Sequence, residues 1–199
     1  MIHTIRVHAE HEYDVVVGCD WQSSLKDSLG SYTRVALVYS SAMRDHIKGF
    51  KPDNTEIHYF EVADGEGAKT SQSLQSLWNW LGAAGFTRSD AVVGIGGGTI
   101  TDLAGFAAAS WLRGIDWIAV PTTVAGMVDA AIGGKTGINS DFGKNLIGAF
   151  HSPQKVLIDT SWLTTLSDRD FAAGLAEVVK CGFIMDGKIL DLVNGKGVA

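Results

Sequence analysis

Short apolar runs alternate with segments of helical periodicity from the first residues to about residue 165, and this alternation most constrains the fold. Strands are predicted at 4–8, 13–18, 34–39, 55–62, 91–95, 116–120 and 155–158. Several of these runs are continuously apolar, as is typical of parallel strands covered on both faces. The pattern therefore predicts an α/β fold in which residues 1–165 form a Rossmann-like domain with a parallel sheet.

The segments between the strands carry helix signals. Asp20 can cap a helix that runs to about Leu29, and a second helix is expected to begin near Thr70. This second segment repeats apolar residues at helical spacing, at Leu74, Leu77, Trp78 and Leu81. A third helix should follow the glycines at 96–98 and, being apolar nearly all round through Leu112, should be buried.

The pattern changes after residue 165. Ser167 and Asp170 form a capping box, and the sequence FAAGLAEVVKCGFI is an amphipathic helix. We expect residues 166–199 to be the first helices of a helical second domain that is cut short, because an amphipathic face would otherwise stay uncovered.

Composition excludes several classes of protein. The 199 residues carry a formal net charge of −6, whereas a nucleic-acid-binding surface would be basic. The apolar run at 106–112 is too short to span a membrane, and the N-terminus lacks the apolar core of a signal peptide. Two cysteines, Cys19 and Cys181, make no disulfide framework and favour a reducing cytoplasm. We expect neither a nucleic-acid nor a membrane partner.

The stretch from residue 119 to 150 combines glycines with charged and amide side chains. It contains six glycines together with Thr122, Thr123, Asp129, Lys135, Lys144 and Asn145. Glycines let the backbone approach a ligand closely, lysines supply charge for phosphate, and the Asp and Asn side chains give oriented hydrogen bonds. This composition predicts a site for a phosphorylated, polyhydroxylated small molecule.

Two further glycine-bearing turns follow predicted strands. Glycines 96–98 lie between a strand and a helix, where backbone N–H groups and the helix N-terminus can receive a pyrophosphate. The sequence DGEGAK at 64–69 follows an earlier strand, and Glu66 and Lys69 are candidates for ribose hydroxyls and cofactor phosphates. A plain tight turn at 96–98 and a solvated loop at 64–69 remain open.

Glu177 and Lys180 lie three residues apart on one face of the predicted helix. They could form a surface ion pair, or a metal ligand beside a cation that binds substrate. Their apolar neighbours favour an enclosed face, but both interpretations stay open. The histidines show no helical pairing of the kind that binds a metal.

Four sequence blocks, in order along the chain, resemble the 3-dehydroquinate synthase family: GGGTITDLAGFAAASWLRG, VPTTVAGMVDAAIGGKTGIN, GKNLIGAFHSP and GLAEVVK. The resemblance implies a phosphate-releasing lyase that makes 3-dehydroquinate from 3-deoxy-D-arabino-heptulosonate 7-phosphate in the shikimate route to aromatic amino acids. It also implies NAD, a divalent metal (zinc or cobalt) and a homodimer.

The resemblance implies roles for individual residues. For NAD binding they are Asp64, Gly65, Glu66, Gly67, Ala68, Lys69, Gly98, Thr99, Ile100, Thr101, Asp102, Thr122, Thr123, Lys135, Lys144, Trp162, Leu163, Thr164 and Thr165. For substrate binding and catalysis they are Asp129, Lys135, Asn145 and Lys180, with Arg113 reaching the substrate phosphate of the neighbouring subunit. Glu177 would be a metal ligand, which places the metal on the helical second domain.

The implied chemistry is a transient oxidation of the C5 hydroxyl to a ketone, which acidifies the adjacent C6 proton, followed by β-elimination of phosphate, re-reduction and aldol closure, with the substrate phosphate as its own base. Two departures stand out. Ser40 occupies a place where the family often has an acidic residue for the adenosine ribose, and the family's metal-ligand histidines are absent from this sequence. A metal-dependent polyol dehydrogenase and a stand-alone nucleotide-binding module are the alternatives.

Overall fold

The computed structural model describes residues 1–195, which contain a seven-stranded sheet of order β1-β2-β9-β6-β5-β3-β4. Its strands are β1 (His3–His8), β2 (Glu12–Val17), β3 (Arg34–Ser40), β4 (Glu56–Val62), β5 (Ala91–Gly96), β6 (Asp116–Pro121) and β9 (Lys155–Ile158). Every pairing is parallel except that of β1 with β2. The prediction of a Rossmann-like sheet is confirmed, with one correction. A link of three residues between β1 and β2 allows only antiparallel pairing.

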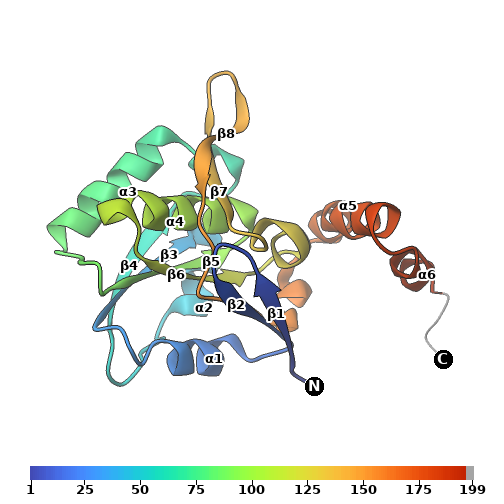
Figure 1. The fold of residues 1–199 in the computed structure, drawn as a ribbon, viewed down its shortest axis with the longest axis horizontal. Coiled ribbons are helices and arrows are strands. Elements are labelled where there is room, and N and C mark those ends of the chain that lie inside the picture. The colour runs from blue at the N-terminus through green and yellow to red at the C-terminus, as the bar shows by residue number, and fades with distance from the viewer. Residues whose placement is uncertain (196–199) are drawn as a thin grey trace.

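Helices cover both faces of this sheet (Figure 1). On one face lie α3 (Ser71–Ala83) and α4 (Gly98–Ser110), and on the other lie α1 (Trp21–Ser28) and α2 (Arg44–Ile47). The central strands β3, β5 and β6 are apolar and almost completely buried between the two layers. Burial on both faces explains why these strands are continuous apolar runs in the sequence.

The predicted helix starts are confirmed. The Asp20 carboxylate accepts a hydrogen bond from Ser23 N at 2.9 Å, and the Thr70 hydroxyl accepts one from Ser73 N at 3.1 Å. The third helix is shorter than predicted, because α4 ends at Ser110 and a 3₁₀ turn, Trp111–Arg113, follows. Leu112 there has a φ of 50°, which is incompatible with a continuing right-handed helix.

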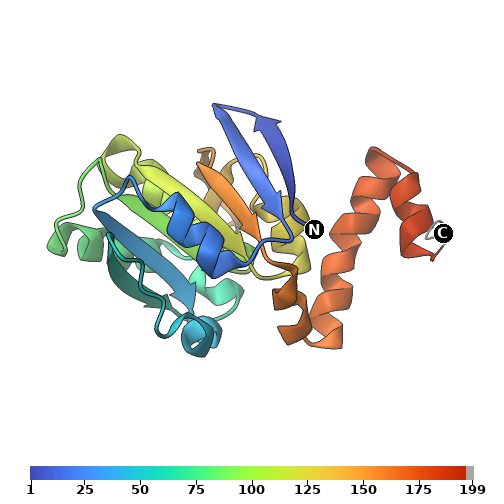
Figure 2. The same ribbon diagram turned by 90° about the horizontal axis from the view of Figure 1, so that it is seen from below.

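The last helices lie beside the sheet domain (Figure 2). After a 3₁₀ segment, Thr160–Thr165, comes α5 (Asp168–Ile184), and α6 (Lys188–Val193) follows it. The predicted cap is confirmed, since the Ser167 hydroxyl accepts a hydrogen bond from Asp170 N at 3.1 Å. A boundary between two domains near residue 165 stays a prediction. No helix within residues 1–195 has the length and apolar character needed to cross a membrane.

The glycine-rich stretch forms structure that the sequence did not predict. A single π-helical turn spans Gly126–Ala130, and an antiparallel hairpin follows, with β7 (Lys135–Ser140) and β8 (Gly143–Phe150). The hairpin packs against α4 and projects beyond it (Figure 1). Its strands approach so closely that a Cβ on Gly137 would lie 2.5 Å from the Ile147 carbonyl oxygen. Gly137 therefore serves strand pairing, a purpose that the composition of this stretch did not predict.

Candidate functional site

A groove runs along the carboxyl ends of β3, β4, β5 and β6, where parallel sheets gather their ligands. We call it the strand-end groove, and its cavity volume is about 550 Å³. The predicted residues that line it are Asp64, Gly65, Gly98, Thr99, Ile100, Thr122, Thr123, Thr165 and Glu177. Ser40 lines it as well, and the N-terminal half of α5 forms one wall. The turn at 64–69, the triple-glycine turn and α5 therefore meet at one site.

The triple-glycine turn places the N-terminus of α4 at this groove. Gly97 is the N-cap, and no side chain caps the helix there, so the first backbone N–H groups remain available to a ligand. A Cβ on Gly97 would lie 3.1 Å from Thr123 Cγ2, and one on Gly98 would lie 3.0 Å from Ala130 Cβ. The turn thus needs glycine for packing, and it leaves a helix N-terminus suited to an anionic group.

Lys69 lies in a buried position between α4 and the β7–β8 hairpin. Its ammonium contacts Asn145 Oδ1 and lies 2.5 Å from Asp102 Oδ2, and the residue is only 3% exposed. Burial raises the pKa of the Asp102 carboxyl, although Lys69 donates to it and opposes this effect. The structure therefore makes Lys69 an internal cation, and the alternative of a solvated loop lysine is wrong.

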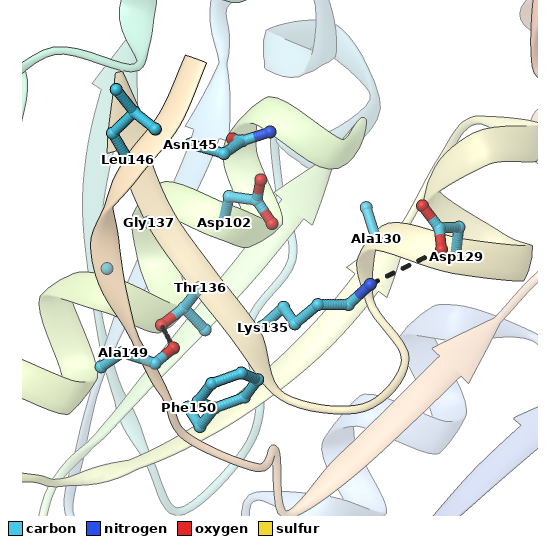
Figure 3. A pocket seen from close by; sticks show the side chains of 11 residues that line it. Asp102, Asp129, Ala130, Lys135, Thr136, Gly137, Asn145, Leu146, Ala149 and Phe150 are labelled. Carbon is cyan, nitrogen blue, oxygen red and sulfur yellow. Dashed lines mark hydrogen bonds and ion pairs between the residues drawn. The ribbon is translucent and has the colours of Figure 1, made fainter. Parts of the chain in front are cut away.

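A second cavity, of about 460 Å³, lies between α4, the π-helical turn and the hairpin. Figure 3 shows the side chains that line this hairpin cavity. They include Asp102 from α4, Asp129 from the turn, and Lys135 and Asn145 from the hairpin. Three residues that sequence analysis expected to act together, Asp129, Lys135 and Asn145, thus line one cavity.

A row of alternating charges connects the two cavities. Glu177 forms an ion pair with Lys180, whose ammonium lies 3.2 Å from Asp129 Oδ1. The same Asp129 oxygen lies 3.9 Å from Lys135 Nζ (Figure 3). Glu177 lines the strand-end groove and Asp129 lines the hairpin cavity. Hydrogen bonds to Glu177 and Asp129 raise the pKa of Lys180, which keeps this ammonium charged.

Other predicted residues lie outside both cavities. Arg113 is exposed at the far end of α4, remote from the groove at the helix N-terminus. Lys144 is exposed on β8 but close enough to Glu66 to favour its ionised form. Trp162 is 3% exposed and packs against Trp21, with ring centroids 5.8 Å apart. Gly67, Ala68, Thr101, Leu163 and Thr164 line neither cavity.

The described residues do not complete a metal site. Within residues 1–195 there is no group of three or more His, Cys, Asp or Glu side chains that could hold a metal ion. A catalytic zinc site normally has three protein ligands, so Glu177 could supply only one. No chemical step through a metal follows from these residues alone.

Several residues of the site were not predicted from the sequence. Asn139 on β7 bonds to both Glu66 and Asn145, and Thr136, Leu146 and Phe150 line the hairpin cavity. The sequence feature that could have predicted all of them is the hairpin, because a tight turn between Ser140 and Gly143 joins two strand-forming segments. Recognising that turn would have placed Phe150 opposite Lys135 and Asn139 across from the segment that contains Asn145.

Comparison with known proteins identifies the family. The sequence model described as 3-dehydroquinate synthase N-terminal matches residues 59–173, which include β5, α4, both turns and the whole hairpin. The chain belongs to the 3-dehydroquinate synthase family. It is 49% identical over 187 residues to 3-dehydroquinate synthase of Streptomyces avermitilis, an alignment that covers 92% of this chain and 52% of that relative. The chain spans about half the length of the curated relatives it matches.

Solved structures of related synthases are similar in fold. A 2-epi-5-epi-valiolone synthase from Streptomyces hygroscopicus, solved with NAD⁺ and Zn²⁺, gives a TM-score of 0.85 at 30% identity and covers 96% of this chain and 55% of its own. A 2-deoxy-scyllo-inosose synthase, solved with carbaglucose-6-phosphate, NAD⁺ and Co²⁺, gives 0.81 at 27% identity, covering 89% and 50%. A probable glycerol dehydrogenase from Sinorhizobium meliloti, at 0.66 and 16% identity, shares the fold alone.

Proposed function

We propose that this protein acts as a 3-dehydroquinate synthase, a carbon–oxygen lyase that converts 3-deoxy-D-arabino-heptulosonate 7-phosphate to 3-dehydroquinate and phosphate in the shikimate pathway. The observation that carries the proposal is the row Glu177, Lys180, Asp129 and Lys135, which connects a nucleotide-sized groove to a polar cavity in a member of this family. Free cysteines and the nature of this pathway favour a cytoplasmic enzyme.

NAD fits the strand-end groove. The uncapped N-terminus of α4 would hold the pyrophosphate, since its N–H groups and helix dipole favour negative charge. Asp64 lines the groove after β4, and Glu66 lies next to it, bonded to Thr99 of the groove, so both carboxylates are placed where they could accept hydrogen bonds from ribose hydroxyls. NAD, when bound, would take a hydride from the substrate and return it. Ser40 lies at the end of β3 in place of an acid, so Asp64 is the carboxylate on that side of the groove.

The hairpin cavity would hold the substrate. Lys135 offers an ammonium and Asn145 an amide to the substrate phosphate, and Asp129 keeps Lys135 and Lys180 on the same side of the cavity. Lys69 is held by Asp102 and Asn145, so its buried charge would favour anionic groups nearby without direct contact. These residues bind and orient the substrate, and the redox chemistry belongs to the cofactor.

The remaining roles involve a second subunit and a divalent metal, Zn or Co. We propose a homodimer in which Arg113 of one copy reaches the substrate phosphate of the other. Arg113 is exposed on a turn with φ of 67° and lies far from the cavities of its own chain, as such a role requires. Glu177 would be one metal ligand, with residues 166–199 belonging to a helical metal- and substrate-binding domain and the other ligands lying outside the described residues.

The decisive experiment uses the natural gene product with the heptulosonate phosphate, NAD and a divalent metal. We expect release of inorganic phosphate without net NADH, and loss of activity after chelation. Lys135→Ala should lower kcat by about 10²–10³-fold, as expected when a group that stabilises negative charge is removed. Lys51→Ala is the control, because Lys51 is an exposed lysine before β4, away from both cavities. Full phosphate release by Lys135→Ala would contradict the assigned role.

The same assay separates the alternatives. A polyol dehydrogenase would accumulate NADH with a diol such as glycerol and release no phosphate. A stand-alone nucleotide module would bind NAD equally well after removal of residues 167–199. We expect this deletion to weaken NAD binding, because α5 forms one wall of the strand-end groove.

A further inference from the structure

Asn139 occupies the irregular position of the β7–β8 hairpin. The strand pairing changes from Ile138 opposite Ile147 to Ser140 opposite Gly143, which is a β-bulge. One residue of β7 therefore faces residues 144–146 of β8, and the regular ladder cannot satisfy all their backbone groups. Asn139 is half-buried there, at the junction between the hairpin, the turn at 64–69 and α4.

Three hydrogen bonds fix Asn139. Its backbone N–H donates to the Lys69 carbonyl at 2.9 Å, and its Nδ2 donates to Glu66 Oε1 at 2.8 Å. Its Oδ1 accepts from the Asn145 backbone N–H at 2.9 Å. The network defines the amide orientation, because a flipped amide would set an acceptor against the Glu66 carboxylate and a donor against an N–H.

The two side-chain partners of Asn139 are each connected to one of the cavities: Asn145 lines the hairpin cavity, and Glu66 bonds to a residue that lines the strand-end groove. Asn145 has a φ of 58°, a left-handed conformation that needs local support, and its side chain accepts from Lys69 while it lines the hairpin cavity. Glu66 also accepts from Thr99 Oγ1 at 3.1 Å, and Thr99 lines the strand-end groove. Burial opposes ionisation of Glu66, but the Asn139 hydrogen bond, Lys69 and Thr99 outweigh it and lower the Glu66 pKa.

We propose that Asn139 is a positioning residue that couples the two cavities, because it holds Asn145 in its left-handed conformation and orients Glu66 beside the strand-end groove. It touches neither cavity directly and acts through these two neighbours. The inference rests on the proposed synthase function. It goes further than that function, because a change in the hairpin at Asn139 would then alter NAD binding as well as substrate turnover.

The test compares Asn139→Ala and Asn139→Asp in the natural gene product. Asn139→Ala removes both side-chain hydrogen bonds, and we expect kcat to fall by about 100-fold, the effect of a displacement of ~1 Å at a reacting group. We also expect the Kd for NAD, measured by direct titration, to rise by about 10-fold, since one oriented hydrogen bond to a charged group is weakened. Ser140→Ala is the matched control on the same strand, since the Ser140 hydroxyl accepts only from Phe142 N within the hairpin turn.

Asn139→Asp gives a readout that loss of folding does not produce. The new carboxylate still accepts from Asn145 N but faces the Glu66 carboxylate, so the two repel when both are ionised. As the pH falls, one shared proton restores a hydrogen bond between them. The kcat of Asn139→Asp relative to wild type should therefore rise toward low pH, while the ratio for Asn139→Ala stays flat.

Two outcomes would overturn this role. One is that Asn139→Ala keeps the wild-type kcat and NAD affinity. The other is that the kcat of Asn139→Asp relative to wild type does not change with pH. If Asn139→Ala does not fold, as shown by circular dichroism, the pH profile of Asn139→Asp decides. Failure of the wild-type protein to release phosphate would contradict the synthase function instead. The NAD titrations would then still report whether Asn139 orients Glu66.

Discussion

The central strands β3, β5 and β6 and the hairpin β7–β8 serve different purposes, although glycines occur both in β5 and in the hairpin. The central strands are buried on both faces between helices, and their residues form the core. Most of β8 is exposed, including Leu146 at 63% and Phe150 at 80%. The hairpin nevertheless carries Lys135 and Asn145 into a cavity.

The glycines of the two regions show the same contrast. A Cβ on Gly94 of β5 would lie 2.8 Å from Ala104 Cβ, so this glycine lets α4 pack on the sheet. A Cβ on Gly148 of β8 would lie 2.0 Å from the Thr136 carbonyl oxygen, so this glycine lets two strands approach each other. Glycine supports core packing in one region and the shape of a cavity in the other.

The largest effect on stability is expected in the central sheet. Leu37 on β3 is completely buried, and Leu37→Ala should lower the free energy of unfolding by about 2–5 kcal/mol through lost burial and a cavity. Denaturant unfolding measures this loss. The kcat of the remaining folded protein should stay unchanged, and a large fall in kcat would show that the sheet shapes the site directly.

A matched pair of glycine substitutions should separate the two regions. Gly94→Ala overpacks the contact between β5 and α4, and we expect a loss of about 1–3 kcal/mol in the free energy of unfolding. Gly137→Ala pushes the hairpin strands apart, which moves Lys135 and Asn145, and we expect kcat to fall by about 100-fold with little change in unfolding. Unfolding curves and phosphate release should be measured on both. If the two variants lost similar amounts of unfolding free energy and of kcat, the glycines of the two regions would not have different purposes.

The smallest effect is expected at the hairpin tip. Phe142 is 95% exposed and lines neither cavity, so Phe142→Ser should change the free energy of unfolding by less than about 0.5 kcal/mol and leave kcat unchanged. A clear loss of stability in the natural gene product would mean that this tip packs against a surface outside the described residues. The contrast between a stable core and an independent hairpin would then need revision.

Sequence patterns alone determined where the strands and helices with regular local periodicity lie. Continuous apolar runs predicted the buried strands, and hydroxyl or carboxylate residues before a helical segment predicted the caps at Asp20, Thr70 and Ser167. The residue types at 119–150 also predicted a polar site that contains Asp129, Lys135 and Asn145. In each of these cases the signal lies within one continuous stretch of the sequence.

Only the tertiary structure decided how those residues meet. Three features join residues far apart in the chain: the burial of Lys69 between Asp102 and Asn145, the row from Glu177 to Lys135, and the hydrogen bond from Asn139 to Glu66. The hairpin escaped prediction because glycines interrupt its apolar alternation, and because its packing on α4 is a contact that local sequence does not reveal. Local sequence specifies which elements form, whereas contacts between distant segments set the distances on which a site depends.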